Sequence, residues 1–189
     1  MGMKRKFVQK AICLLLLLCY VSTLLFAEKK DSIREQLQTK LPDTSRVHLL
    51  IDLGHTLTEE GNYTEAMKAM KEAQTISGRL GDPVIEVEVY KNMGITHFYQ
   101  GDNNAAIACW EKARKIAEQK HYTKSIYALK MNIANALMSN GDYLQAQQNY
   151  FEVLTQAEQN KDKEQIAKCL INIGILYGSQ KRNDSCRHY

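Results

Sequence analysis

Three side chains near one another in the sequence have types and spacing suited to metal chemistry. His48 and His55 are seven residues apart, with Asp52 between them on the same face of an expected helix. A metal-binding pair on a helix usually sits four residues apart. His48 and Asp52 meet that spacing, and Asp52 and His55 approach it. A solvated polar set explains the same pattern, so we expect no metal site here.

Motifs of catalysis are missing from the sequence. It contains no glycine-rich phosphate loop, no Gly-x-Ser-x-Gly and no His-Glu-x-x-His. Beyond residue 27 the cysteines are Cys109, Cys169 and Cys186, an odd number with wide spacing that makes no disulfide framework. We therefore expect a protein that is not an enzyme and carries no cofactor. An enzyme with an unrecognised site is the weakest of the alternatives.

The positive charge of the chain is concentrated at its start. The formal net charge is +4, and the first 27 residues hold four basic side chains and no acid. The remainder has 21 basic and 21 acidic residues and is neutral. Proteins that bind nucleic acid usually have a net basic footprint, so that class of function is disfavoured.

Residues 1–27 have the pattern of a secretory leader. Basic residues precede an apolar run over 11–27, and its 17 residues are short for a membrane span of about 20. Ala27 suits the position before a cleavage site and predicts a mature start at Glu28. Leu25 is bulkier than such sites prefer. We therefore expect an exported, periplasmic protein, with a membrane anchor formed by residues 11–27 as the alternative.

The rest of the chain repeats with a period of 40 residues. Large apolar, small and amide residues recur in register, and glycines follow the small residues by seven positions. The small residues are Gly54, Gly94, Ala134 and Gly174; the later glycines are Gly61, Gly101 and Gly141; alanines follow at Ala66, Ala106 and Ala146; bulky residues follow at Met70, Trp110 and Tyr150. Two positions before each small residue stand Asp52, Asn92, Asn132 and Asn172.

Each repeat is expected to form two antiparallel helices joined at the later glycine. Glycine adopts the left-handed conformation that ends many helices, and the Asn or Asp after it suits the start of the next helix. Gly81, Asp82 and Pro83 give the same signals between the first two units. These patterns predict an all-α solenoid with units over 43–82, 83–122, 123–162 and an incomplete 163–189.

A short helix is expected before the repeats, within residues 28–42. Ile33, Leu37 and Leu41 are spaced by four residues on one face. Asp31 and Ser32 are candidates to cap it. Pro42 ends the segment, and the next helix is expected to begin near Ser45.

The repeat resembles the tetratricopeptide repeat, in a version of about 40 residues. Asn92-Met93-Gly94, Gly101-Asp102 with Ala106, and Gly141-Asp142-Tyr143 with Ala146 carry the resemblance, which covers 43–189. His97 departs from it, in a position held elsewhere by Leu57, Leu137 and Tyr177, and Lys181 replaces the last turn glycine. The segment before the repeats resembles the periplasmic region of bacterial sensor histidine kinases and related regulators. Residues 183–189 look like a second helix cut short, so we interpret the chain as a fragment; the alternative is a partial last helix that suffices as a cap.

The resemblance implies a peptide-binding groove lined by the first helix of each unit. In the family, an Asn at the repeated amide position often bonds the backbone of a bound segment. The groove residues implied here are Asp52, His55, Lys91, Asn92, Ile95, Phe98, Met131, Asn132, Asn135, Met138 and Asn172. The alternative is that the Asn residues support helix packing. The implied function is a scaffold that binds a protein or peptide, as the sensing region of a signalling protein or as a structural adaptor in the cell envelope.

Overall fold

The computed structural model describes residues 29–187, with side-chain positions as far as Lys181. The expected leader, 1–27, lies outside the described residues. A first helical segment covers residues 29–37. The helices that follow are α2 (Asp43–Glu59), α3 (Tyr63–Leu80), α4 (Pro83–Tyr99), α5 (Asn103–Gln119), α6 (Thr123–Asn140), α7 (Tyr143–Gln159) and α8 (Lys163–Arg187). Over residues 29–187 there is no strand, and no helix there has both the length and the hydropathy to cross a membrane.

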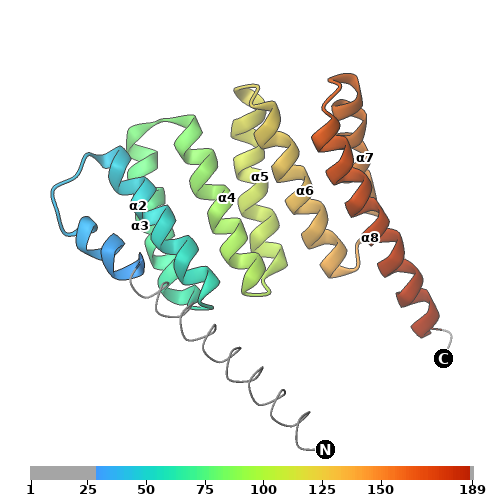
Figure 1. Ribbon diagram of the computed structural model, residues 1–189, viewed down its shortest axis with the longest axis horizontal. Helices are drawn as coiled ribbons and strands as arrows, with labels where there is room; N and C mark the ends of the chain where they lie inside the picture. Colours follow the sequence, from blue (N-terminus) through green and yellow to red (C-terminus); the bar gives the residue numbers. More distant parts are fainter. Residues whose placement is uncertain (1–28, 188–189) are drawn as a thin grey trace, which may run out of the picture.

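The helices form hairpins that follow one another along the long axis of the molecule (Figure 1). Helices α2, α4, α6 and α8 make one layer, in which each contacts the next. Helices α3, α5 and α7 cover the other side and do not contact one another. A layer whose helices touch lies on the inside of a curved array, and a layer whose helices are spread lies on the outside. The predicted all-α solenoid is confirmed.

Glycines end the first helix of each complete hairpin. Gly61, Gly101 and Gly141 have φ of 77°, 87° and 86°, which is the left-handed region that costs other residues free energy. The following residue then caps the second helix in two cases. The carboxylate of Asp102 accepts a hydrogen bond from the backbone N–H of Ala105 at 3.0 Å, and Asn62 accepts from Glu65 at 3.4 Å. The turn chemistry expected from the repeat is therefore present in the first two hairpins, while Asp142 makes no side-chain bond at the start of α7.

The turns between hairpins use the same left-handed conformation with different residues. Gly81 has φ of 62°, and Asp82 accepts from the N–H of Val84 at 2.9 Å, as the sequence predicts. Forty and eighty residues later the same position is held by His121 (φ 57°) and Lys161 (φ 56°). Both are L-residues with a Cβ, so these two turns are strained relative to the first.

The small residues of the repeat let the two helices of each hairpin approach closely. Gly54 lies against Met70 and Gly94 lies against Trp110, and the indole N–H of Trp110 donates to the carbonyl of Lys91 at 2.9 Å. Ala106 is fully buried. The buried apolar residues form two clusters, one from Ile33 to Met93 and one from Val87 to Leu176, and the partly buried Tyr90 packs against both.

The two ends of the array differ from expectation. Asp31 and Ser32 lie inside the first helical segment and do not cap it, because helix already covers residues 29 and 30. That segment is fixed to α2 by Arg46, whose Nη1 donates to the carbonyl of Leu37 at 2.9 Å. Helix α2 begins at Asp43, two residues before the predicted start.

Helix α8 corrects the prediction of a break in the fourth unit. It runs without interruption from Lys163 to Arg187, so residues 183–187 of the expected second helix continue α8, and 188–189 lie outside the described residues. Lys181 occupies the position of the turn glycines. Lysine and its neighbours Gln180 and Arg182 are good helix formers, and no residue there favours a left-handed cap.

Candidate ligand-binding face

The residues implied as a groove lie on the inside layer, with unequal exposure. We call the exposed sides of α2, α4, α6 and α8 the inner face. Asp52 and His55 are exposed there, and Asn92 is buried. The others are half-buried: Lys91, Ile95, Phe98, Met131, Asn132, Asn135, Met138 and Asn172. The repeated amides therefore do not form a uniform ladder.

Asn92 is turned into the structure and away from the inner face. It is 7% exposed, and its Nδ2 donates to the carbonyl of Glu88, one turn earlier in the same helix, at 2.9 Å. Helices α2 and α4 are the closest pair of the inside layer, and the hydroxyl groups of Thr58 and Thr96 meet between them at 2.9 Å. This close approach covers Asn92, so the free amide expected there is not found.

Asn132 and Asn172 differ from Asn92. Both side chains are half-buried on α6 and α8, and neither makes a hydrogen bond to another residue of the described chain. An amide group that is partly exposed and not engaged within the protein can both donate to and accept from a peptide backbone. These two residues are therefore the best-placed members of the amide column.

Asn135 has a partner inside the protein. Its Oδ1 accepts a short hydrogen bond from the hydroxyl of Tyr150, which is buried in the hairpin of α6 and α7. Burial raises the pKa of Tyr150 to about 12, since the phenolate is poorly solvated there, and the nearby Cys169 adds to the shift. Asn135 thus holds a core hydroxyl group and has less capacity left for a ligand.

The two histidines of α2 pair with glutamates. His48 Nδ1 lies 3.5 Å from Glu88 on α4, and His55 Nδ1 lies 3.5 Å from Glu59 one turn later. Across the described residues, no three His, Cys, Asp or Glu side chains come together in a way that would hold a metal ion. The two imidazoles are about half-exposed, and each lies beside a glutamate carboxylate.

The aromatic residue offered by the inner face is Tyr99. Phe98 is half-buried, with its ring 5.9 Å from that of Trp110 and 6.3 Å from that of Tyr99. Tyr99 is 65% exposed, and Ile175 on α8 is 49% exposed. The expected aromatic anchor at Phe98 is a core contact. From the sequence we expect Phe98 and Tyr99 together to form an aromatic anchor, with the larger contribution from Phe98, but the exposed ring of the two is that of Tyr99.

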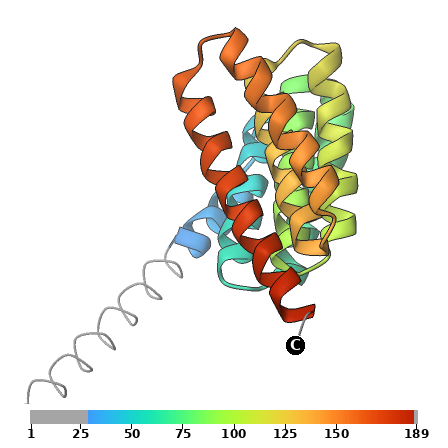
Figure 2. The ribbon, with the colours of Figure 1, turned by 90° about the vertical axis from the view of Figure 1, so that its right-hand side faces the viewer.

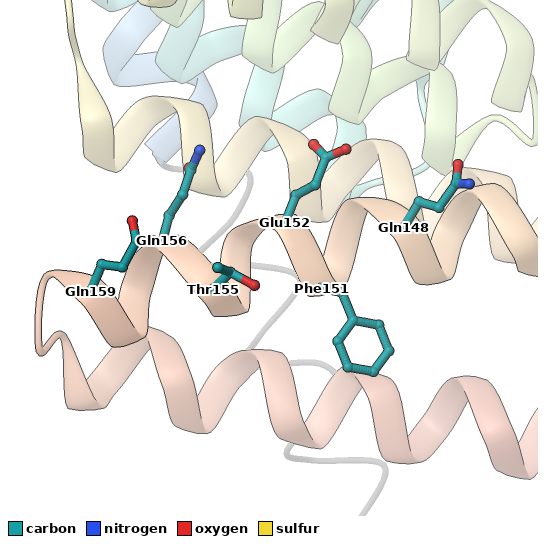
Figure 3. A pocket seen from close by; sticks show the side chains of 6 residues that line it. All are labelled: Gln148, Phe151, Glu152, Thr155, Gln156 and Gln159. Carbon is teal, nitrogen blue, oxygen red and sulfur yellow. The ribbon is translucent and has the colours of Figure 1, made fainter.

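The outer layer carries a separate hollow on α7. Its volume is about 750 Å³, and its lining residues are Gln148, Phe151, Glu152, Thr155, Gln156 and Gln159. Figure 3 shows Gln156 and Glu152 on one side of the helix and Phe151 pointing to the other. Glu152, the charged member, pairs with Lys130 at 2.7 Å. Mostly neutral residues from one helix do not assemble a reactive group.

Comparison with known families identifies the repeat. Residues 44–119 match the model of the tetratricopeptide repeat, which is fewer than half of the residues of the chain. No curated protein sequence matches the chain at a significant level. The matched range corresponds to the first two hairpins, α2 to α5.

Solved structures share the fold over most of this chain. BtubC from P. vanneervenii has a TM-score of 0.67 at 21% identity, over 83% of this chain and 65% of its own. The apo form of RapI has 0.69 at 18%, over 81% and 43%. A Rap protein complexed with Competence and Sporulation Factor has 0.58 at 16%, over 76% and 48%. At these identities the likeness is one of fold, and the chain spans less than two thirds of each of these proteins.

Proposed function

We propose that this chain is a non-catalytic scaffold that binds an extended protein or peptide segment on its inner face. The observation that carries the proposal is the combination of partly exposed, unengaged amides with exposed apolar side chains in one layer. Asn132 and Asn172 supply the amides, and Tyr99 and Ile175 supply apolar surface. The tetratricopeptide match over 44–119 and the fold shared with a Rap protein complexed with Competence and Sporulation Factor support it.

The chemistry of the inner face suits a main chain better than a small molecule. Amides bond to backbone N–H and C=O groups of any sequence, and large exposed rings bury apolar side chains of a ligand. Half-exposed charged groups, such as Glu88 beside His48, add selectivity more than affinity. A segment with alternating apolar residues therefore fits this face.

The cellular location of the protein is the second part of the proposal. The basic and apolar leader at 1–27 supports export to the periplasm, where the chain serves as the sensing region of a bacterial signalling protein. A structural adaptor in the cell envelope is the alternative. Cell fractionation and N-terminal sequencing test the location: a start near Glu28 in the periplasmic fraction supports it, and a start at Met1 in the membrane fraction supports the anchor.

Binding is tested by selecting peptides from a displayed random library on the purified chain. We expect selected peptides to lose affinity for Asn132→Ala and Tyr99→Ala. Matched controls on the outer layer are Gln148→Ala and Leu144→Ala, since Gln148 is an exposed amide and Leu144 is 70% exposed. Failure to select any peptide, or equal losses in both sets of variants, would contradict the proposed function.

A further inference from the structure

A cavity of about 200 Å³ lies where the first helical segment, residues 29–37, meets α2 and α3. Its floor is apolar, because Leu50, Leu53 and Leu57 of α2 and Ala69 of α3 line it and are all buried. Figure 2 shows the array from the α8 end, and the first helical segment, drawn in blue, lies behind it at the other end. Protein interiors rarely leave gaps larger than a water molecule, so a space of this size is a candidate ligand site.

The rim of the cavity carries more positive than negative charge. Arg46 is already engaged, since its Nε and Nη2 donate to Oε1 of Glu72 at 3.1 and 2.8 Å. Lys68 and Glu65 add one charge of each sign. The guanidinium of Arg34 makes no hydrogen bond or ion pair to another residue of the part of the chain that the structure describes. This side chain therefore has all its donors available for an anion.

The second hairpin shows what occupies the equivalent space. A step of 40 residues relates Leu50 to Tyr90 and Arg34 to Gln74. The ring of Tyr90 is half-buried and packs against both apolar clusters. Its hydroxyl accepts a hydrogen bond from Nε2 of Gln74 at 3.0 Å, and Nζ of Lys112 lies 5.6 Å from the centroid of the ring. An aromatic ring with a polar tip thus stands in the second hairpin where the first has a cavity.

The third hairpin also has a long side chain at this position. Lys130 is the next residue of the column, and its Nζ lies 2.7 Å from a carboxylate oxygen of Glu152 on α7. Leu50 is the shortest side chain of the three and has no polar tip to reach across. The cavity therefore follows from a change of residue type at a repeated position, and its space suits the ring that Leu50 lacks.

We propose that this cavity binds a small aromatic carboxylate. The ring of the ligand lies on Leu50, in the place that the second hairpin gives to the ring of Tyr90. The carboxylate accepts hydrogen bonds from Arg34, which stands where Gln74 donates to the tyrosine hydroxyl. An apolar cavity of about 150 Å³ is enough for benzene, so 200 Å³ holds one ring. A guanidinium is charged and can bind a carboxylate through two parallel hydrogen bonds, which favours the anion over a neutral ligand.

The cavity is separate from the inner face, so this inference goes beyond the proposed function. Asp52 and His55 are exposed on the inner side of α2, whereas the leucines of the cavity floor are on its buried side. The two surfaces share no residue. Failure of the peptide selection described above would therefore leave the cavity proposal standing, and failure of the cavity proposal would leave the inner face unaffected.

Ligand-observed NMR titration of the purified chain with phenylacetate tests the cavity, because the method detects weak binding. We expect saturable binding of phenylacetate, and binding of the neutral phenylacetamide that is weaker by about fivefold or more. Acetate, which lacks the ring, is expected not to bind. Absence of phenylacetate binding overturns the proposal, and so does equal affinity for phenylacetate and either of the other two compounds.

Two substitutions taken from the second hairpin test the location. Leu50→Tyr fills the cavity with a ring of the chain itself, and it is expected to weaken phenylacetate binding at least about tenfold without lowering the melting temperature. Arg34→Gln is expected to remove the preference for phenylacetate over phenylacetamide. The matched control is Arg79→Gln, since Arg79 is an exposed arginine of α3 outside the cavity, and this variant is expected to keep the preference.

The variants can contradict the proposal in two ways. Phenylacetate binding that is unchanged in a folded Leu50→Tyr variant overturns the proposed cavity. If Leu50→Tyr does not fold, the two arginine variants decide. A preference for phenylacetate that survives Arg34→Gln, or that Arg79→Gln removes equally, overturns the assignment of the carboxylate to Arg34 and with it the proposal.

Discussion

Trp110 lies across Gly94 so closely that any side chain at position 94 would collide with it. A Cβ built on Gly94 falls 2.3 Å from Nε1 of the indole and 2.5 Å from Cδ1. The indole has no room to move away, because it is 2% exposed and its N–H is bonded to the carbonyl of Lys91. This contact brings α4 and α5 together and explains why the small residue and the bulky residue 16 positions later recur as a pair.

Gly94→Ala is expected to lower the free energy of unfolding by about 1–3 kcal/mol, since overpacking outweighs the better helix propensity of alanine. Adding Trp110→Tyr recreates the Ala134–Tyr150 pair of the third hairpin. The double variant is expected to recover about 1 kcal/mol relative to the sum of the single changes. Urea denaturation of the four proteins measures this.

Gly78→Ala is the control for that experiment. Gly78 is inside α3, and a Cβ there meets nothing within 4 Å. Alanine is expected to stabilise this position by about 0.5–1 kcal/mol. Equal losses in the free energy of unfolding for Gly78→Ala and Gly94→Ala would show that collision with Trp110 is not the cause of the destabilisation.

The periodic part of the fold is what the sequence predicts well. The glycine turns and the pairing of small and bulky residues depend on contacts between residues close in sequence, which each unit repeats. The left-handed angle of Gly101 and the burial of Ala106 follow from those columns. The sequence pattern alone therefore predicts the all-helical solenoid, and the structure confirms it.

The parts that differ between units were harder to predict. Asn92 and Asn132 share a column, but the closer packing of α2 on α4 buries only Asn92, and a column does not show how far apart neighbouring helices lie. Phe98 and Tyr99 are adjacent, and which ring faces the core depends on the position of Trp110. The exposure of Asn132 and of Tyr99 required the structure.

His97→Leu is expected to stabilise the fold. Nδ1 of His97 is buried without a hydrogen-bond partner in the described residues, and such a group costs about 1–3 kcal/mol. Leu57 and Leu137 hold this position in other units and are buried. We expect a gain of about 1 kcal/mol in urea denaturation, and a loss for the reverse change, Leu137→His. A loss with His97→Leu would mean that the imidazole has a partner in solution.

The strained turns between hairpins give another stability prediction. His121 and Lys161 have the left-handed angle that Gly81 adopts at the equivalent position. His121→Gly and Lys161→Gly should each stabilise by roughly 0.5–1 kcal/mol, because relief of about 1–2 kcal/mol of strain exceeds the entropy lost by glycine. Lys120→Gly, at φ of −103°, should instead destabilise. Thermal unfolding compares the three, and a gain at position 120 would contradict the account.

The raised pKa of Tyr150 predicts that the stability of the fold depends on pH. Its pKa is raised to about 12 in the folded chain against 10 in the unfolded one, so the unfolded state loses the proton first. Stability contributed by the neutral hydroxyl is therefore present below pH 10 and is lost as the pH rises toward 12. Tyr150→Phe should cost about 0.5–1.5 kcal/mol at neutral pH, through the lost bond to Asn135, and this difference should shrink above pH 10.

The difference in burial between Asn92 and Asn132 allows ligand binding to be tested separately from helix packing. This prediction rests on the proposed function. With a peptide selected as above, Asn132→Ala is expected to weaken binding roughly two- to tenfold, the equivalent of one lost hydrogen bond of about 0.5–1.5 kcal/mol. Its melting temperature should stay the same or rise, because alanine is the better helix former and the amide of Asn132 holds nothing within the described chain. Asn92→Ala should leave the affinity within about twofold, since that amide is occupied by the carbonyl of Glu88 and covered by α2. Fluorescence anisotropy with a labelled peptide measures the affinities, and equal weakening by the two changes, or a lowered melting temperature for Asn132→Ala alone, would assign the column to helix packing.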